Sequence, residues 1–135
     1  MADLQSALHA RLSVSLGHSR VYWNAVPQNA DFPYVRLSTV SDPRPQHLTG
    51  YDTARQTRIQ ADVFALEPRA GGGGYGEARA ISETIIAAVA QPATVSGVKF
   101  GRTKAEGPRD MGEDVAGVGY VYRLSLDLLA EHSLA

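Results

Sequence analysis

The chain has 135 residues, of which 44% are hydrophobic and 20% are charged, so its length and apolar content suit one domain with one core. Thirteen Lys and Arg residues against fourteen Asp and Glu residues give a net charge of -1, which argues against attraction to nucleic acid or an anionic membrane through overall charge. The absence of cysteine excludes disulfides, thiolate metal sites and a cysteine nucleophile. We therefore expect one domain over residues 1–135 whose fold depends on packing alone.

No segment predicts export or membrane insertion. The first residues include Asp3, His9 and Arg11, where a secretory signal requires an apolar stretch. The longest apolar run, residues 85–90, is far shorter than the roughly 20 residues of a membrane-spanning helix. We expect a protein that remains in the cytosol and binds no membrane.

Two segments have the three- and four-residue apolar spacing of amphipathic helices. Residues 3–16 place a leucine at every fourth position, and Asp3 is well placed to cap the first turn. Residues 78–89 repeat alanine, isoleucine and valine at similar spacing, and Pro92 ends this second segment. Each helix has an apolar stripe that must pack on another apolar surface, most simply a sheet.

Alternation of apolar and polar residues predicts strands over residues 34–41, 55–64 and 118–128, with a weaker signal over 94–104. Such alternation favours an antiparallel sheet with one face in water, because strands buried on both faces are continuously apolar. The elements predict an α+β fold of the order α-β-β-α-β-β. The architecture expected from this order is a two-layer sandwich with two amphipathic helices on one face of an antiparallel sheet of about four strands.

Four consecutive glycines at positions 71–74 lie between a predicted strand and a predicted helix, where a dinucleotide-binding loop would stand. No acid lies between Glu83 and Glu106 to bind a ribose, and Glu77 and Ala78 stand where a phosphate-binding loop requires Lys and then Ser or Thr. We therefore expect a flexible connector and no cofactor.

No other motif predicts catalysis or metal binding. His47 lies near serines and aspartates that a Ser-His-Asp hydrolase would use, but the chain has no G-x-S-x-G motif. The four histidines are scattered without metal-ligand spacing, and the acids around Asp110 and Glu113 lack the calcium-loop pattern. A small hydrolase or nucleotide-binding enzyme is the less favoured hypothesis.

The polar face of the predicted sheet carries charges of both signs. Arg36, Arg58 and Arg123 are expected there together with Asp62 and Asp127, and no aromatic residue is interleaved for base stacking. Mixed charge of this kind suggests either a face that meets another protein or an ordinary solvated face. It does not predict direct, sequence-specific binding of nucleic acid.

Six segments, spread in order between residues 4 and 129, point to one family. They are LQSALHARL, RPQHLTGYD, RIQADVFA, EARAISETIIAAV, VKFGRTKAEGPRD and YRLSLDLL. This order of elements resembles the tail completion, or tail terminator, proteins of long-tailed phages and gene transfer agents. One departure is the segment EPRAGGGGYG, which lengthens the link between the central strand and the second helix.

The resemblance implies a structural virion protein that forms a hexameric ring on the finished tail tube, stops its polymerisation and docks the head-tail connector, without catalysis or cofactor. The implied partners are further copies of the chain, the tail tube protein and the connector. The implied place is the head-proximal end of the tail, after assembly in the bacterial cytoplasm. Another head-tail adaptor or stopper protein is the alternative.

By the same analogy, two polar segments predicted as loops, residues 42–52 and 106–117, are the expected contacts between subunits or with the tube and connector. The candidate interface residues in them are Arg44, His47, Tyr51, Arg109, Asp110 and Glu113.

Overall fold

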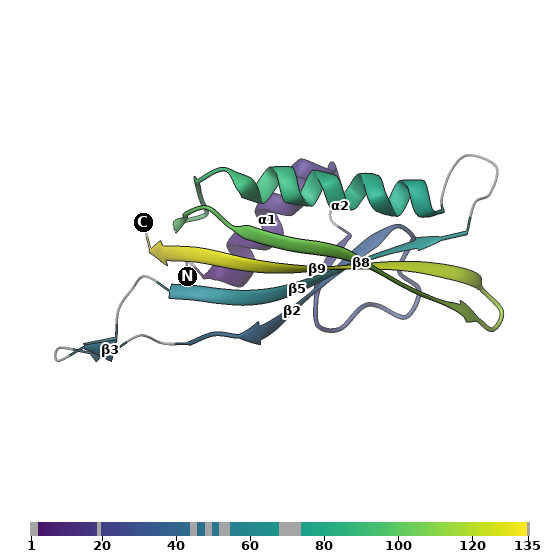
Figure 1. Ribbon diagram of the computed structural model, residues 1–135, viewed down its shortest axis with the longest axis horizontal. Coiled ribbons are helices and arrows are strands. Elements are labelled where there is room, and N and C mark those ends of the chain that lie inside the picture. The colour runs from purple at the N-terminus through teal and green to yellow at the C-terminus, as the bar shows by residue number, and fades with distance from the viewer. Residues whose placement is uncertain are drawn as a thin grey trace.

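The computed structural model describes residues 3–18, 20–43, 46–47, 50–51, 55–67 and 74–134. Within these residues, two helices accompany a seven-stranded sheet and a small separate hairpin (Figure 1). The helices are α1 (Leu4–Leu16) and α2 (Tyr75–Ala90). The sheet contains β1 (Val21–Trp23), β2 (Tyr34–Ser41), β5 (Arg55–Leu66), β6 (Ala93–Val95), β7 (Val98–Phe100), β8 (Lys104–Val115) and β9 (Gly119–Leu134). The hairpin consists of β3 (Gln46–His47) and β4 (Gly50–Tyr51).

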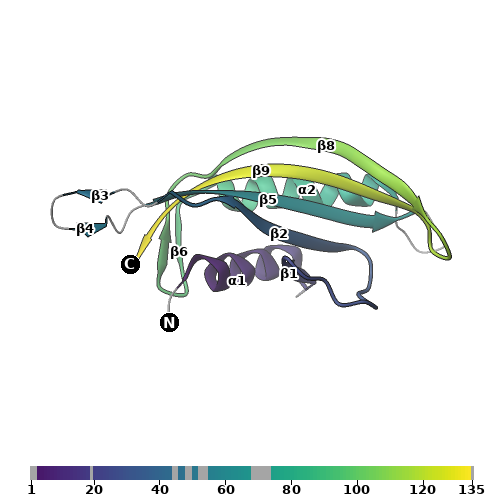
Figure 2. The same cartoon turned by 90° about the horizontal axis from the view of Figure 1, so that it is seen from below.

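The sheet is built around β9, its longest strand. The strand order is β1-β2-β5-β9-β7-β6, and β8 pairs with β9 on the side away from β5. β8 follows the first part of β9 and β7 pairs with its last residues, so two strands share one edge of β9. The long strands arch over the helices as a curled half-barrel (Figure 2).

The predicted two-layer α+β sandwich with about four strands is therefore wrong. The domain is mostly sheet, its seven strands curl instead of forming a flat layer, and β1 pairs with β2 in parallel. Strands twist with a fixed hand, and the twist accumulates along strands as long as β5 and β9. The sequence pattern identified individual strands, but it did not reveal how many strands pair in the sheet or how strongly the sheet curves.

The largest departure is β8, most of which was expected to be the loop 106–117. Nearly all of its side chains are exposed, so its sequence shows no alternation of apolar and polar residues. Its register is irregular between Glu106 and Arg109, where Gly107 has a φ of 107°. A Cβ at Gly107 would lie 2.8 Å from the carbonyl oxygen of Ser125. Pairing with β9, and not local propensity, determines this strand.

The two predicted helices and the alternation along β2, β5 and β9 are confirmed. The amide of Ser6 donates to Asp3 Oδ1 at 2.7 Å, and Gly17 ends α1 with a φ of 77°. The inward side chains form one core between both helices and the sheet; among the largest are Leu12, Leu37, Ile59, Ile85, Phe100, Leu124, Leu126 and Leu128.

Arg11 links the two helices from a buried position that periodicity did not reveal. Its Nη2 donates to the carbonyl oxygens of Ala88 at 2.6 Å and Gln91 at 2.5 Å, which belong to the end of α2. Its guanidinium carbon lies 5.2 Å from the centre of the Phe100 ring. The last turn of α2 has no basic residue, and its cap, Gln91, is extended. Arg11 therefore supplies, from α1, the cation that a helix C-terminus favours.

Replacing Arg11 with Ala is expected to lower the free energy of unfolding by about 2 kcal/mol, because two partly buried, charge-assisted hydrogen bonds to the end of α2 are lost. Urea denaturation followed by circular dichroism measures the change. Ser15→Ala, at an exposed position of the same helix, should be close to neutral. Equal effects of the two substitutions would contradict the role given to Arg11.

Candidate functional site

The sheet face turned away from the helices contains a buried carboxylate held between two arginines. The side chain of Asp62, on β5, is fully buried, and its Oδ2 accepts hydrogen bonds from Arg36 at 3.2 Å and Arg123 at 3.1 Å. Gln60 donates to both carboxylate oxygens. The three charged residues come from neighbouring strands, since β2 and β9 flank β5. We call these four residues the Asp62 cluster.

Two opposing influences act on the pKa of Asp62. Burial alone would raise the pKa, because desolvation penalises the charged form. The hydrogen bonds from Gln60 and Arg123, together with the charge of Arg123, outweigh this effect of burial. The pKa of Asp62 is therefore lowered below its ordinary value. The carboxylate is therefore ionised at neutral pH and fixes both guanidinium groups.

An aromatic ring lies beside both arginines of the cluster. The centre of the Phe64 ring is 5.4 Å from the guanidinium carbon of Arg36 and 5.7 Å from that of Arg123, and Tyr34 stacks on the same ring at 4.9 Å. The expectation that no aromatic residue is interleaved on this face is therefore wrong. Both guanidinium groups are therefore engaged within the molecule, by the Asp62 carboxylate and the Phe64 ring.

The hairpin formed by β8 and β9 ends in a segment that combines acidic and apolar residues. Residues 110–118, which we call the acidic arm, contain Asp110, Glu113 and Asp114 and no Lys or Arg. Their side chains are exposed, and exposed apolar residues lie among them: Met111, Val115 and Val118.

A tyrosine cluster holds the base of the acidic arm. The hydroxyl of Tyr75, at the start of α2, donates to the carboxylate of Asp110 at 3.2 Å. The Tyr75 and Tyr120 rings both pack edge-on against Tyr122, at 5.9 and 4.8 Å between ring centres. Gly112 leaves the space that the Tyr120 ring occupies, because a Cβ there would lie 2.5 Å from its hydroxyl oxygen. The base of the arm is thus fixed to α2 while its outer part extends into solvent.

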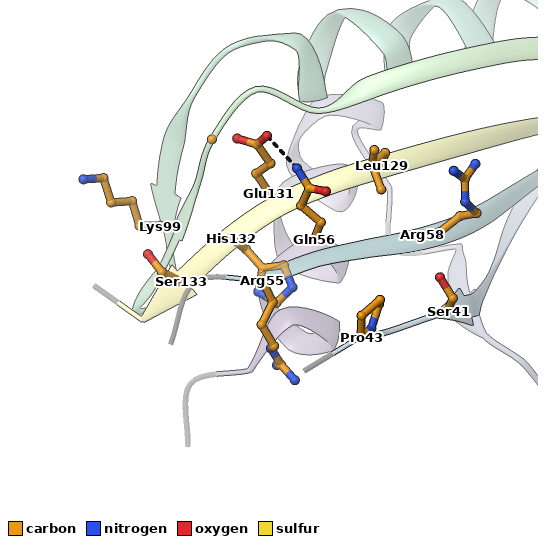
Figure 3. Close-up of a pocket in the computed structure, with 11 residues that line it drawn as sticks. Ser41, Pro43, Arg55, Gln56, Arg58, Lys99, Leu129, Glu131, His132 and Ser133 are labelled. Carbon is orange, nitrogen blue, oxygen red and sulfur yellow. Dashed lines mark hydrogen bonds between the residues drawn. The ribbon is translucent and has the colours of Figure 1, made fainter. Parts of the chain in front are cut away.

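At the other end of the sheet lies a cleft of about 670 Å³, which we call the basic cleft (Figure 3). Arg58 on β5 and Lys104 on β8 are both paired in register with Leu129 on β9, so two cations flank one half-buried leucine. Three cations line the cleft itself, Arg55 and Arg58 from β5 and Lys99 from β7, and Lys104 lies at its edge. The acid in the lining, Glu131, accepts a hydrogen bond from Gln56 at 3.0 Å.

The wall of the basic cleft is fixed by a chain of polar contacts. Nε2 of the buried His132 lies 2.7 Å from the Thr57 hydroxyl, which donates to Asp42 at 2.9 Å. Asp42 also forms an ion pair with Arg55 at 3.4 Å. Burial, and to a lesser extent the charge of Arg55, lowers the pKa of His132. A neutral imidazole with its proton on Nε2 completes this chain as the donor to Thr57.

The structure places the predicted interface residues in three different settings. Arg109 lies on β8 and forms an ion pair with Asp127 at 3.7 Å, whereas Asp110 and Glu113 belong to the acidic arm. His47 and Tyr51 are backbone members of the β3–β4 hairpin, and Arg44 lies outside the described residues. The glycines at 71–73 also lie outside the described residues.

The basic cleft had no local sequence signal, because its lining comes chiefly from β5, β7 and β9, which are far apart in the chain. Among the described residues, no group of three or more His, Cys, Asp or Glu side chains is placed to hold a metal ion. In the same residues, neither helix is long and apolar enough to cross a membrane.

Comparisons with known proteins agree with the resemblance drawn from the sequence. A family model described as tail completion protein gp17 matches residues 2–130. A chain in a solved structure described as "Virion of native gene transfer agent (GTA) particle" has the same fold, with a TM-score of 0.57 and 19% identity over 96% of this chain and 94% of that chain. No curated protein matches. Because the family model spans nearly the whole chain, this protein belongs to the tail completion protein gp17 family and is a structural component of a phage-type tail in the virion.

Proposed function

We propose that this chain forms a hexameric ring at the head-proximal end of the tail tube, where it stops tube polymerisation and provides the docking surface for the head-tail connector. The observation that carries this proposal is the tail completion family match over residues 2–130. The comparison structure supports it through its description as a gene transfer agent virion, although the measured likeness is one of fold.

The surface of the molecule suits assembly with other proteins. β8 is a long, exposed edge strand, and such edges offer unpaired backbone groups to a neighbour unless they are protected. Acidic and exposed apolar side chains lie together in the acidic arm at one end of the sheet, and cations line the basic cleft at the other end. The Asp62 cluster links β2, β5 and β9 on the same sheet.

The capping role can be tested by adding the purified protein to polymerising tail tubes and imaging them by electron microscopy. We expect ring-shaped density at one end of each tube and tubes that stop lengthening once it is present. Native mass spectrometry of the released ring should give six copies. Density along the sides of the tubes, or tubes that elongate normally, would contradict capping, whereas another copy number would contradict only the hexamer.

A further inference from the structure

We propose that neighbouring copies of this chain join head to tail, with the acidic arm of one copy seated in the basic cleft of the next. This inference rests on the ring proposed above and identifies the two surfaces that build it. The occupant of the cleft is therefore a second copy of this chain.

The arm has the properties of an inserted element. Glu113 and Asp114 form no ion pair with any described residue, so both carboxylates are available to a partner. Val115 and Val118 are each 37% exposed beside them, and Met111 is 45% exposed. An exposed apolar group bordered by charges is the usual composition of a protein contact, with a dry centre and a polar rim.

The cleft has the complementary properties. Four cations lie in it or at its edge without an ion pair to any described residue: Arg58, Lys99, Arg102 and Lys104. Half-buried Leu129 provides an apolar floor between Arg58 and Lys104. A second hollow of about 360 Å³, lined partly by Arg102 and Lys104, adjoins the basic cleft and shares Leu129 with it. Glu131 lines both hollows and is held by Gln56, and these four cations outnumber it. Acidic side chains around an apolar tip would therefore match this arrangement in both charge and polarity.

The two surfaces of one molecule cannot meet each other. β9 begins beside the arm at Gly119 and reaches the cleft at Leu129, and the arm and the C-terminus lie at opposite ends of the sheet (Figure 1). At about 3.3 Å per residue, these ten positions separate the surfaces by roughly 33 Å along one rigid strand. The partner of each surface must therefore belong to another molecule.

The charges also indicate how the copies are arranged. A twofold contact of arm with arm would oppose carboxylates, and a twofold contact of cleft with cleft would oppose cations. A contact between the arm of one copy and the cleft of another avoids both of these repulsions. Every pair of joined copies then still has one free arm and one free cleft. Such contacts repeat from copy to copy, and they close into a ring when the rotation between copies permits it.

The natural chain contains no cysteine, which permits a direct test by thiol crosslinking. Val118→Cys labels the arm and Ser41→Cys labels the cleft lining, and neither substitution alters charge. The two proteins are mixed, with and without tail tubes, and treated with a short bis-maleimide. We expect a crosslinked dimer from this mixture, and a ladder of multimers when both substitutions are on one chain.

The matched control replaces the arm label with Val14→Cys, which is 84% exposed on α1. This control should crosslink to Ser41→Cys much less than the arm variant does. Equal crosslinking by the control, or a ring without arm-to-cleft crosslinks, would overturn the inference.

Charge reversal provides an independent measurement. Glu113→Lys with Asp114→Lys on the arm, or Lys99→Glu with Lys104→Glu at the cleft, should each weaken ring formation by roughly tenfold or more. Both reversals on one chain should recover most of the loss, and circular dichroism should show unchanged folding. Rings that persist in the single-surface variants would overturn only the arm-to-cleft contact. If the wild-type protein forms no ring and does not cap tubes, the proposed function itself fails.

Discussion

Leu124→Asp is expected to unfold the domain. Leu124 is 1% exposed on the inward face of β9, in the core beneath the helices. An aspartate there would bury a carboxylate without a partner, at a cost of about 5 kcal/mol or more, which is comparable to the whole stability of a typical domain. Far-ultraviolet circular dichroism and urea denaturation would show the loss of a cooperative transition.

Val40→Asp is the matched control for this substitution. Val40 is 53% exposed near the end of β2, so the same change of side chain leaves the new carboxylate in water. Its effect on the free energy of unfolding should be within about 1 kcal/mol. A stable, cooperatively folded Leu124→Asp protein would show that the inward face of β9 is not the core.

The second large effect is expected for Asp62→Asn. The substitution removes the charge shared by Arg36 and Arg123 and leaves two guanidinium groups close together on the sheet. Because both arginines keep some access to water, we expect a loss of about 2 to 3 kcal/mol, less than for a completely buried ion pair. Asp127→Asn, which affects one exposed ion pair on the same face, should cost less than about 1 kcal/mol.

The contribution of Asp62 also has a defined pH dependence. Its pKa in the folded protein is lowered, so at low pH the unfolded chain takes up the proton before the folded protein does. The stabilisation is complete above the unfolded pKa of about 3.9 and is lost as the pH falls through the lower folded value. The difference in stability between the wild type and Asp62→Asn should therefore shrink below about pH 4. A difference that stays constant down to pH 2 would contradict this assignment.

Sequence patterns predicted the elements whose side chains divide between core and solvent. The leucines of α1 and the alternating residues of β5 and β9 have such patterns because each element packs on one face only. β8 has both faces in solvent along most of its length, so burial left no pattern in its sequence. The curvature and strand order depend on pairings between distant segments, which periodicity does not encode.

Sequence reasoning named some residues of the candidate surfaces and missed others. Asp110 and Glu113 were named as candidate contacts by analogy with the family, in a segment expected to be a loop; the structure places both on the exposed strand β8, and their role in a contact stays a prediction. The basic cleft depends on Arg58, Lys99 and Leu129, which become neighbours only through strand pairing. Arg11 was missed because a charged side chain within an amphipathic helix gives no indication that it caps another helix.

The pairing of β9 has a mechanical consequence. β9 is one uninterrupted strand of 16 residues, bonded along one side to β5 and along the other to β8 and then β7. A pull between its two ends acts along the strand, so the hydrogen bonds on both flanks are loaded together in shear and not broken one after another. A tensile force transmitted through a chain of such subunits would be borne by the part of the domain best able to resist extension.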